Sequence, residues 1–133
     1  MIKINEMNAA MLAFVGDSYY DLKIREMLIR RGINKSKKFH QLTVSYVSAK
    51  SQSRILQQLI EESFLSDEEL DVARRGRNTT SGSIPKNTDV ATYRQSTAFE
   101  ALIGFLYLTE QFLRLDEIIG RGIAIREEDL KNG

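Results

Sequence analysis

The amino-acid sequence predicts a single all-α domain that spans residues 1–133. A chain of 133 residues has room for one domain with its own hydrophobic core. Apolar residues recur at spacings of three and four along most of the chain, and no segment shows the strict alternation of an exposed strand. The one proline, Pro85, lies in a segment rich in Gly, Ser, Thr and Asn, so it does not interrupt the periodic segments.

The first half of the chain contains three predicted helices. The first spans residues 8–31, where apolar side chains keep helical spacing and Gly32 provides a left-handed stop. A second helix begins after Ser36. Ser48 is the expected N-cap of a third helix, because its hydroxyl can accept a hydrogen bond from a free backbone N–H.

The second half begins with a capping-box pattern. Ser66 and Glu69 have the required spacing, so a fourth helix starts there and is expected to end near residues 75–76. Residues 77–92 are predicted to form a long, flexible, basic loop, because a loop of this length in a small domain is usually functional or mobile. Two further helices are predicted over residues 93–112 and 116–128.

The formal net charge of +1 hides a block pattern. Residues 22–60 contain nine Lys or Arg against one acid, residues 61–72 contain six acids and no base, and residues 73–94 return to a basic excess. This separation indicates a basic face beside an acidic face, and a basic face favours a polyanionic partner. Ordinary solvated helix surfaces would explain the same pattern.

The chain contains no cysteine, which excludes disulfides and thiolate metal sites. Its N-terminal segment lacks the basic leader of a signal peptide, and its apolar stretch is too short to span a bilayer. We therefore expect a cytoplasmic protein with no membrane partner. Any metal must bind to oxygen ligands or to the single histidine, His40.

Two acids, Asp17 and Glu100, lie within the most apolar helical segments. Each has a nearby glycine, Gly16 and Gly104, although a glycine inside a helix costs about 1 kcal/mol relative to alanine. Glycines at these positions allow two helices to approach closely and to bring the carboxylates together. A buried pair of carboxylates needs a cation, and oxygen ligands favour Mg²⁺ or Mn²⁺.

Structural roles for the same two acids are also open. Asp17 could cap a neighbouring helix, and Glu100 could pair with Arg94 or Arg25. A buried acid in an ion pair has the same sequence context as a metal ligand, so the two residues alone do not decide between these roles.

Several segments resemble the ribonuclease III family. Residues 12–22, LAFVGDSYYDL, resemble the signature helix of the family, and residues 99–108, FEALIGFLYL, resemble its second acidic motif. Residues 48–50, SAK, and residues 74–78, RRGRN, are similar to segments of the Mini-III branch. Two carboxylate motifs about eighty residues apart, in the right order, rarely agree by accident.

The resemblance implies an all-helical, homodimeric ribonuclease III endonuclease domain that cleaves double-stranded RNA with Mg²⁺, for which Mn²⁺ is a possible substitute. It implies that Asp17 and Glu100 are the catalytic metal ligands. Chemistry of this kind needs no nucleophilic Ser, Cys or His. The Mini-III branch further implies maturation of the 23S ribosomal RNA precursor. Phe14 is implied at the dimer interface, because the aromatic residue at this position of the family inserts into a cavity of the partner subunit.

The sequence departs from the standard family pattern at two positions. Standard ribonuclease III has a glutamate where this chain has Ala13 and an aspartate where it has Thr97. This reduced set resembles the Mini-III branch. Asp21, one helical turn after Asp17, is a candidate to support the metal ligands without touching the metal. The alternatives are an RNA- or ribosome-binding relative with weak or no activity, and a helical interaction module.

RNA recognition is expected from the catalytic domain itself, because the usual RNA-binding domain of the family has no counterpart in these residues. Double-stranded RNA is recognised mainly through phosphates and 2′-hydroxyls, which basic side chains contact. The candidate contact residues are Arg74, Arg75, Arg77, Lys86, Lys50 and Arg94. Arginines near the end of a helix also complement its dipole, and the two roles are compatible.

Overall fold

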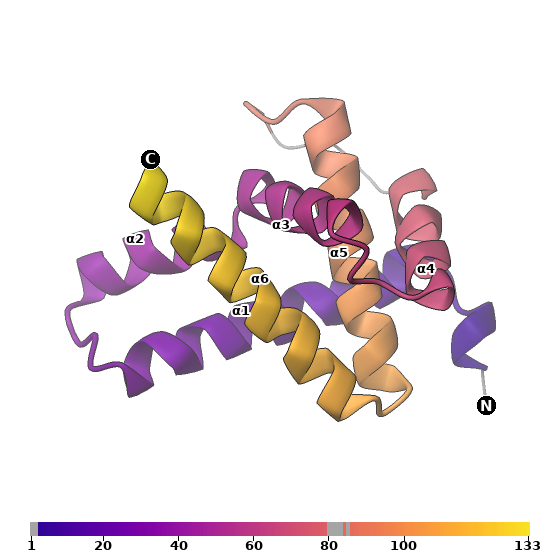
Figure 1. Ribbon diagram of the computed structural model, residues 1–133, viewed down its shortest axis with the longest axis horizontal. Helices are drawn as coiled ribbons and strands as arrows, with labels where there is room; N and C mark the ends of the chain where they lie inside the picture. Colours follow the sequence, from indigo (N-terminus) through magenta and orange to yellow (C-terminus); the bar gives the residue numbers. More distant parts are fainter. Residues whose placement is uncertain (1–2, 80–83, 85) are drawn as a thin grey trace.

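The computed structural model describes residues 3–79, 84 and 86–133, most of which are helical (Figure 1). A short 3₁₀ helix, η1 (Ile4–Glu6), precedes the α-helices. The α-helices are α1 (Ala9–Arg30), α2 (Ser36–Val47), α3 (Ala49–Glu61), α4 (Asp67–Asn78), α5 (Val90–Leu108) and α6 (Phe112–Asn132). The described part of the chain contains no strand, so the all-α prediction is confirmed.

The helix ends follow the predicted capping. Gly32 has a φ of +93°, in the left-handed region, directly after the end of α1. Ser48 caps α3, because its hydroxyl oxygen accepts a hydrogen bond of 3.2 Å from the backbone N–H of Ser51. Ser66 and Glu69 make both hydrogen bonds of the capping box at the start of α4. Local signals therefore place these ends correctly.

The predicted end of α4 near Gly76 is wrong, because the helix continues to Asn78. Gly76 lies where α4 packs against α5, and a Cβ atom at this position would be only 2.7 Å from the Cβ of Ala101. A glycine that permits close packing inside a helix has the same local sequence as one that ends a helix. The contact with a distant segment decides between them.

The predicted loop 77–92 is shorter at both ends than expected. α4 includes its first two residues, and α5 begins at Val90, capped by the side chain of Asp89, which accepts a hydrogen bond of 2.8 Å from the backbone N–H of Thr92. The expected flexibility of this loop falls largely on residues 80–83 and 85, which lie outside the described residues.

The boundary between the last two helices also differs from the prediction. α5 ends at Leu108, and Phe112 begins α6 instead of ending the helix before it. Glu110 has a φ of 58°, which interrupts the helical path between the two. The predicted start at Asp116 is therefore one turn too late, because a short turn inside an apolar stretch leaves the helical spacing almost unchanged.

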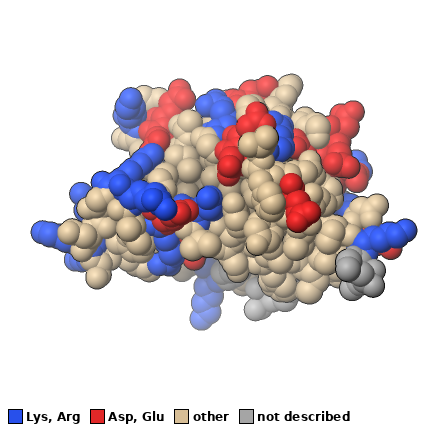
Figure 2. Space-filling model, turned by 90° about the horizontal axis from the view of Figure 1, so that it is seen from below, with Lys and Arg blue, Asp and Glu red and all other residues tan. Residues whose placement is uncertain are grey.

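Charged side chains are mixed on the face of the molecule that Figure 2 shows. Lys and Arg gather toward one end of this face, both signs alternate along one edge, and a broad central area carries no charge. Ion pairs also join the acidic block of the sequence, residues 61–72, to α6. Glu62 binds Arg121 at 2.5 Å, and Glu69 binds Arg114 at 2.8 Å. Two acids of this block are therefore paired with arginines of α6.

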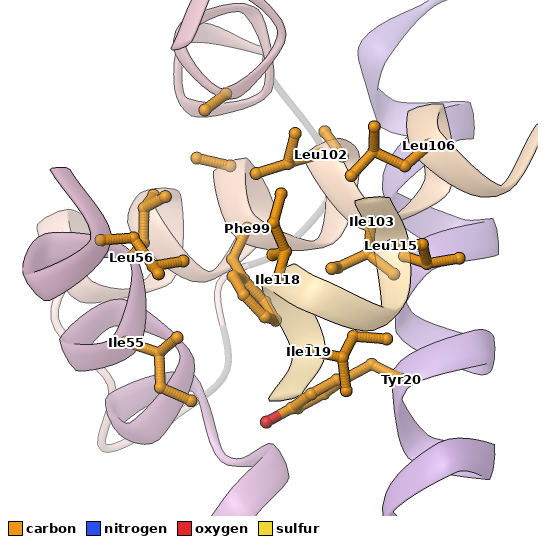
Figure 3. Close-up of a cluster of buried hydrophobic side chains, with 14 of the residues drawn as sticks. Tyr20, Ile55, Leu56, Phe99, Leu102, Ile103, Leu106, Leu115, Ile118 and Ile119 are labelled. Atoms are coloured by element: carbon orange, nitrogen blue, oxygen red, sulfur yellow. The ribbon is translucent and has the colours of Figure 1, made fainter. Parts of the chain in front are cut away.

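α5 is the central helix of the fold and packs against α1, α3, α4 and α6 (Figure 1). Between Ser96 and Leu106 every residue of this helix except Glu100 is buried, as expected of a helix surrounded by others. Phe99, Leu102, Ile103 and Leu106 of this helix are fully buried (Figure 3). Each such side chain contributes about 1.5–3 kcal/mol through burial. No helix in the described ranges has both the length and the apolar character needed to cross a membrane.

α1 and α5 touch through their backbones at two glycines. A Cβ atom on Gly16 would lie 1.7 Å from the carbonyl oxygen of Glu100, and one on Gly104 would lie 1.9 Å from the carbonyl oxygen of Leu12. Neither position has room for any side chain. The predicted approach of two glycine-containing helices is confirmed, and it places Asp17 and Glu100 on adjoining turns.

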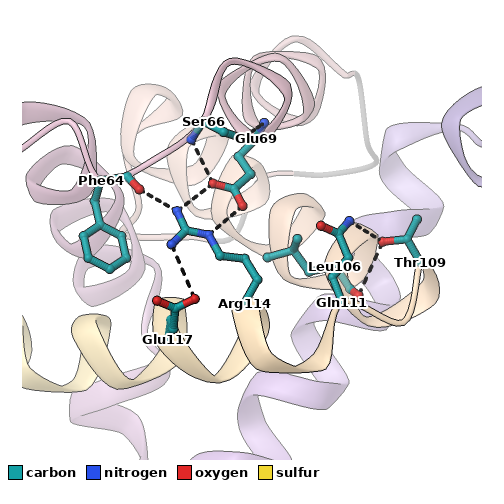
Figure 4. Close-up of polar contacts among 8 residues, drawn as sticks. All are labelled: Phe64, Ser66, Glu69, Leu106, Thr109, Gln111, Arg114 and Glu117. Atoms are coloured by element: carbon teal, nitrogen blue, oxygen red, sulfur yellow. Dashed lines mark hydrogen bonds and ion pairs between the residues drawn. The ribbon is translucent and has the colours of Figure 1, made fainter.

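A buried ion pair joins α6 to the start of α4 (Figure 4). Arg114 donates two hydrogen bonds to the carboxylate of Glu69, at 2.8 and 2.9 Å, and a third to the carbonyl oxygen of Phe64 at 2.5 Å. Burial alone would raise the pKa of Glu69, but the bonds from Arg114 and Ser66 outweigh it and hold this pKa below its usual range. The same carboxylate therefore caps α4 and anchors α6.

Candidate active site

Asp17 and Glu100 line one cavity of about 230 Å³ between α1, α3 and α5. Asp17 comes from α1 and Glu100 from α5, and the glycine contacts described above set the distance between these two helices. The other lining residues are Ala10, Ala13, Phe14, Val47, Ala49, Gln52, Tyr93, Ser96 and Thr97. The fold thus brings together the two acids that the sequence singles out.

The two carboxylates differ in exposure. Glu100 is half-buried, whereas Asp17 is exposed to solvent, so the expectation that both are buried is wrong for Asp17. Burial raises the pKa of Glu100 to about 8, and the negative charge of Asp17 and a hydrogen bond with it act in the same direction. A hydrogen bond from Gln52 acts in the opposite direction. Without a cation, Glu100 is therefore largely protonated at neutral pH.

The chemistry of the cavity fits a hard divalent cation. Two carboxylates whose charges oppose each other gain stability when a cation lies between them. The described residues contain no group of three or more His, Cys, Asp or Glu side chains that could hold a metal ion. Mg²⁺ commonly binds through only one or two carboxylates and keeps several waters, so Asp17 and Glu100 are sufficient protein ligands for it.

The positions of the two missing family acids lie around the same cavity. Ala13 and Thr97 are both buried and both line it. The hydroxyls of Thr97 and Ser96 donate to the carbonyl oxygen of Tyr93, at 3.1 and 2.7 Å. These hydroxyls are engaged with the backbone, so the cavity presents no free hydroxyl nucleophile from these two residues.

Asp21 does not line the cavity. Its carboxylate accepts a hydrogen bond of 2.9 Å from Nε of Arg25, four residues further along α1. Arg25 is therefore paired with Asp21, which removes the alternative that it pairs with Glu100. A supporting role for Asp21 at the metal site stays a prediction.

The predicted RNA-binding residues occupy two regions. Lys50 and Arg94 are exposed and directly follow the cavity residues Ala49 and Tyr93 in the chain. Arg74 and Arg77 instead line a second hollow of about 430 Å³, bounded by α3, α4 and α5. The side chain of Lys86, in the segment between α4 and α5, is also exposed. Contact of these residues with RNA stays a prediction.

Arg75 is held differently from its neighbours on α4. It donates hydrogen bonds to the backbone carbonyl oxygens of Asn5 and Met7, at 3.4 and 2.9 Å. Arg74 pairs with Asp71 on the exposed side of the same helix. The guanidinium of Arg75 therefore anchors the N-terminal segment, a role that the basic cluster in the sequence does not indicate.

Phe14 joins the cavity to an apolar surface. Its side chain is 62% exposed and lines both the cavity with Asp17 and an adjoining hollow of about 390 Å³. That hollow is otherwise lined by Val15, Ser18, Tyr19, Leu22 and Tyr107.

Sequence reasoning missed Gln52, which lines the cavity and is 2% exposed. A signal was present. Gln52 lies in helical phase with the buried Ile55, Leu56 and Leu59 of α3, so it is a polar residue on an apolar stripe. The same reasoning that selects Asp17 applies to it.

An all-helical domain in which two glycine-packed helices bring an aspartate and a glutamate into one cavity has the architecture of a ribonuclease III domain. The family profile described as "Ribonuclease III domain" matches residues 10–111, which include both acids. The chain is 45% identical over 119 residues to a Mini-ribonuclease 3 from Streptococcus pneumoniae, covering 90% of this chain and 93% of the relative.

A second relative and one solved structure are also similar to this chain. A Mini-ribonuclease 3 from Staphylococcus aureus is 43% identical, over 94% of this chain and 93% of the relative. The crystal structure of a protein from Fusobacterium nucleatum superimposes with a TM-score of 0.81 at 29% identity, over 90% of this chain and 96% of that one. The chain belongs to the Mini-ribonuclease 3 branch of the ribonuclease III family.

Proposed function

We propose that this protein is a divalent-cation-dependent endoribonuclease that hydrolyses phosphodiester bonds of double-stranded RNA. Membership of the family supports the reaction class. The observation that carries the proposal to particular residues is the shared cavity of Asp17 and Glu100, in which burial and the nearby charge of Asp17 raise the pKa of Glu100. Such an arrangement is typical of a site that is completed by a cation.

Asp17 and Glu100 are the proposed ligands of Mg²⁺, with Mn²⁺ as a substitute. When bound, the cation would stabilise charge on the phosphate and lower the pKa of a bound water. The role of the two carboxylates is to hold the cation in a fixed position. Asp17 offers an accessible carboxylate, and Glu100 must give up its proton before it can act as a ligand, because burial raises its pKa to about 8. Ala13 and Thr97 supply no further charge, so water would fill the remaining ligand positions of a bound cation.

The proposed enzyme is a homodimer that contacts RNA through its basic side chains. Two sites related by a two-fold axis match the pseudo-two-fold symmetry of a duplex and allow both strands to be cut. The exposed Phe14 and the apolar hollow beside it provide a surface for a second copy. Exposed Lys50 and Arg94, next to the cavity, are the best placed of the predicted phosphate contacts, with Arg77 further away.

The proposed substrate is a stem of the precursor of 23S ribosomal RNA. The test is to incubate the purified protein with a duplex RNA carrying that stem, with Mg²⁺ and separately with EDTA. Cleavage is expected only with Mg²⁺. Asp17→Asn should abolish it, whereas Asp116→Asn, an exposed aspartate of α6, should leave it unchanged. Wild-type turnover by Asp17→Asn would show that this site is wrongly assigned.

A second candidate function is binding of structured RNA or of the ribosome without cleavage. It is favoured by the small number of acids at the cavity, since Ala13 and Thr97 occupy the positions of two family carboxylates. The same experiment separates the two. Binding of the duplex without any Mg²⁺-dependent cleavage would support this candidate.

A further inference from the structure

Gln52 is buried in a place where a polar side chain is costly. It lies on α3 in phase with an apolar stripe, and only 2% of its surface is exposed. The cap at Ser48 fixes the start of α3 and directs the first turns of the helix toward the cavity, where Ala49 and Gln52 both form part of the lining. The fold of α3 therefore determines that Gln52 lies at the cavity.

The two ends of the Gln52 amide have different surroundings. Nε2 donates a hydrogen bond of 2.9 Å to the carbonyl oxygen of Val47. Gln52 lines the same cavity as Glu100, and its amide lowers the pKa of that carboxyl against the larger effect of burial. Oε1 is buried and has no hydrogen-bond partner in the described part of the chain. A buried carbonyl oxygen without a partner destabilises the fold, because it loses its hydrogen bonds to water. This unpaired Oε1 belongs to the cavity that holds the two carboxylates. It can therefore accept a hydrogen bond from a group that binds in the cavity and is not part of the chain.

We propose that Gln52 is a positioning residue of the cation site: its amide N–H holds the Glu100 carboxylate toward Asp17, and its Oε1 accepts a hydrogen bond from a water of the bound cation. This inference rests on the proposed function. In standard family members further carboxylates surround this site, whereas here Ala13 and Thr97 leave the cavity with few polar partners for the cation's waters. A neutral amide adds such a partner without adding a third negative charge.

The experiment measures Mn²⁺ binding to the full chain without RNA, by electron paramagnetic resonance or calorimetry. Gln52→Met keeps the length of the side chain and removes both polar groups. We expect it to weaken Mn²⁺ binding roughly 10- to 100-fold, as substitutions of residues that orient metal ligands do. Gln58→Met is the matched control. It is the same substitution on the same helix, and Gln58 does not line the cavity.

A double-mutant cycle separates positioning from a general structural role. If Gln52 acts through Glu100, then Gln52→Met should change Mn²⁺ affinity much less in a Glu100→Asp background, which keeps a carboxylate ligand on a shorter side chain, than in the wild-type background. Thermal unfolding without metal should change little, because the substitution also removes an unpaired carbonyl oxygen. Equal losses of affinity in both backgrounds, or equal losses for Gln52→Met and Gln58→Met, would overturn the proposal.

The outcomes also distinguish this inference from the proposed function. If wild-type protein binds Mn²⁺ and loses it on Asp17→Asn, but Gln52→Met binds as well as wild type, then only the role of Gln52 is refuted. If wild-type protein binds no Mn²⁺ at the cavity, then the cation-dependent function and the role of Gln52 are both refuted.

Discussion

The packing of Gly16 of α1 against the backbone of α5 gives the sharpest test of how the site is built. Gly16→Ala adds one methyl group to α1, where Cβ would lie 1.7 Å from the carbonyl oxygen of Glu100 and 2.8 Å from the backbone nitrogen of Gly104. Real Cβ atoms essentially never come closer than 3.0 Å, so the shortfall is 1.3 Å. The colliding atoms belong to the backbone, and no change of side-chain rotamer can relieve the contact.

The expected loss of stability follows from two opposing effects. Overpacking in a core costs about 1–3 kcal/mol where side chains can adjust, and a backbone collision belongs at the upper end or above. Replacing glycine by alanine within a helix returns about 1 kcal/mol. We therefore expect Gly16→Ala to lower the free energy of unfolding by at least about 2 kcal/mol.

Gly120→Ala is the matched control. Gly120 lies inside α6, and a Cβ atom there would meet nothing within 4 Å, so this variant should gain about 1 kcal/mol. Urea unfolding followed by circular dichroism, at one protein concentration, measures both variants. If Gly16→Ala unfolds within about 0.5 kcal/mol of wild type, the close approach of α1 and α5 is not a requirement of the fold and the reasoning is refuted.

Three further predictions concern RNA binding, assembly and pH. Arg77→Gln should reduce the slope of log affinity for duplex RNA against log salt concentration by roughly one unit, as the loss of one phosphate contact does. Phe14→Ala should shift the protein toward the mass of a single chain in light scattering at micromolar concentration, because it removes an exposed aromatic anchor. Arg114→Met should cost about 3 kcal/mol at neutral pH by leaving Glu69 buried without its partner, and this deficit should shrink as Glu69 becomes protonated at acidic pH.

The sign of the pH effect is fixed by the depressed pKa of Glu69. In wild-type protein this carboxylate contributes stability above its unfolded pKa of 4.5, and the contribution is lost as pH falls through the lower folded pKa. A deficit for Arg114→Met that stays constant between pH 7 and pH 3 would contradict this account. If Arg77→Gln leaves the salt slope unchanged, then Arg77 does not contact the RNA. If Phe14→Ala remains dimeric, then Phe14 is not an anchor of the dimer interface.

Helix positions were predictable because their signals are local. Spacing of apolar residues, the cap at Ser48 and the capping box at Ser66 act within a few residues of the ends that they define. The predicted helix end is wrong where a contact with a segment distant in the chain determines it. Gly76 remains inside α4 because it packs on Ala101 of α5, and no local rule distinguishes this glycine from a helix stop.

The pairing of Asp17 with Glu100 was predictable for a similar reason. An acid beside a glycine is unfavourable within an apolar helix. Two such positions in one chain indicate that the two acids lie together in the fold. The direction of the surrounding side chains was not predictable. Asp21 is as close to Asp17 along α1 as it is to Arg25, and the arginine binds it. Arg75 has the same charge as its neighbours, but it binds backbone carbonyl oxygens about seventy residues away in the chain.

The same contacts set the stability of the fold and the geometry of the site. The carbonyl oxygen of Glu100 occupies the space that Gly16 leaves open, while its carboxylate faces the cavity with Asp17. Because the pKa of Glu100 is raised to about 8, its ionised form opposes folding increasingly as pH rises from its unfolded value of 4.5 toward 8. A cation that binds the ionised pair offsets this cost, so binding and folding are linked and Mn²⁺ should raise the unfolding temperature. With two carboxylates in place of four, that linkage depends on how rigidly α1 and α5 are held together, and the close approach that Gly16 and Gly104 permit holds them.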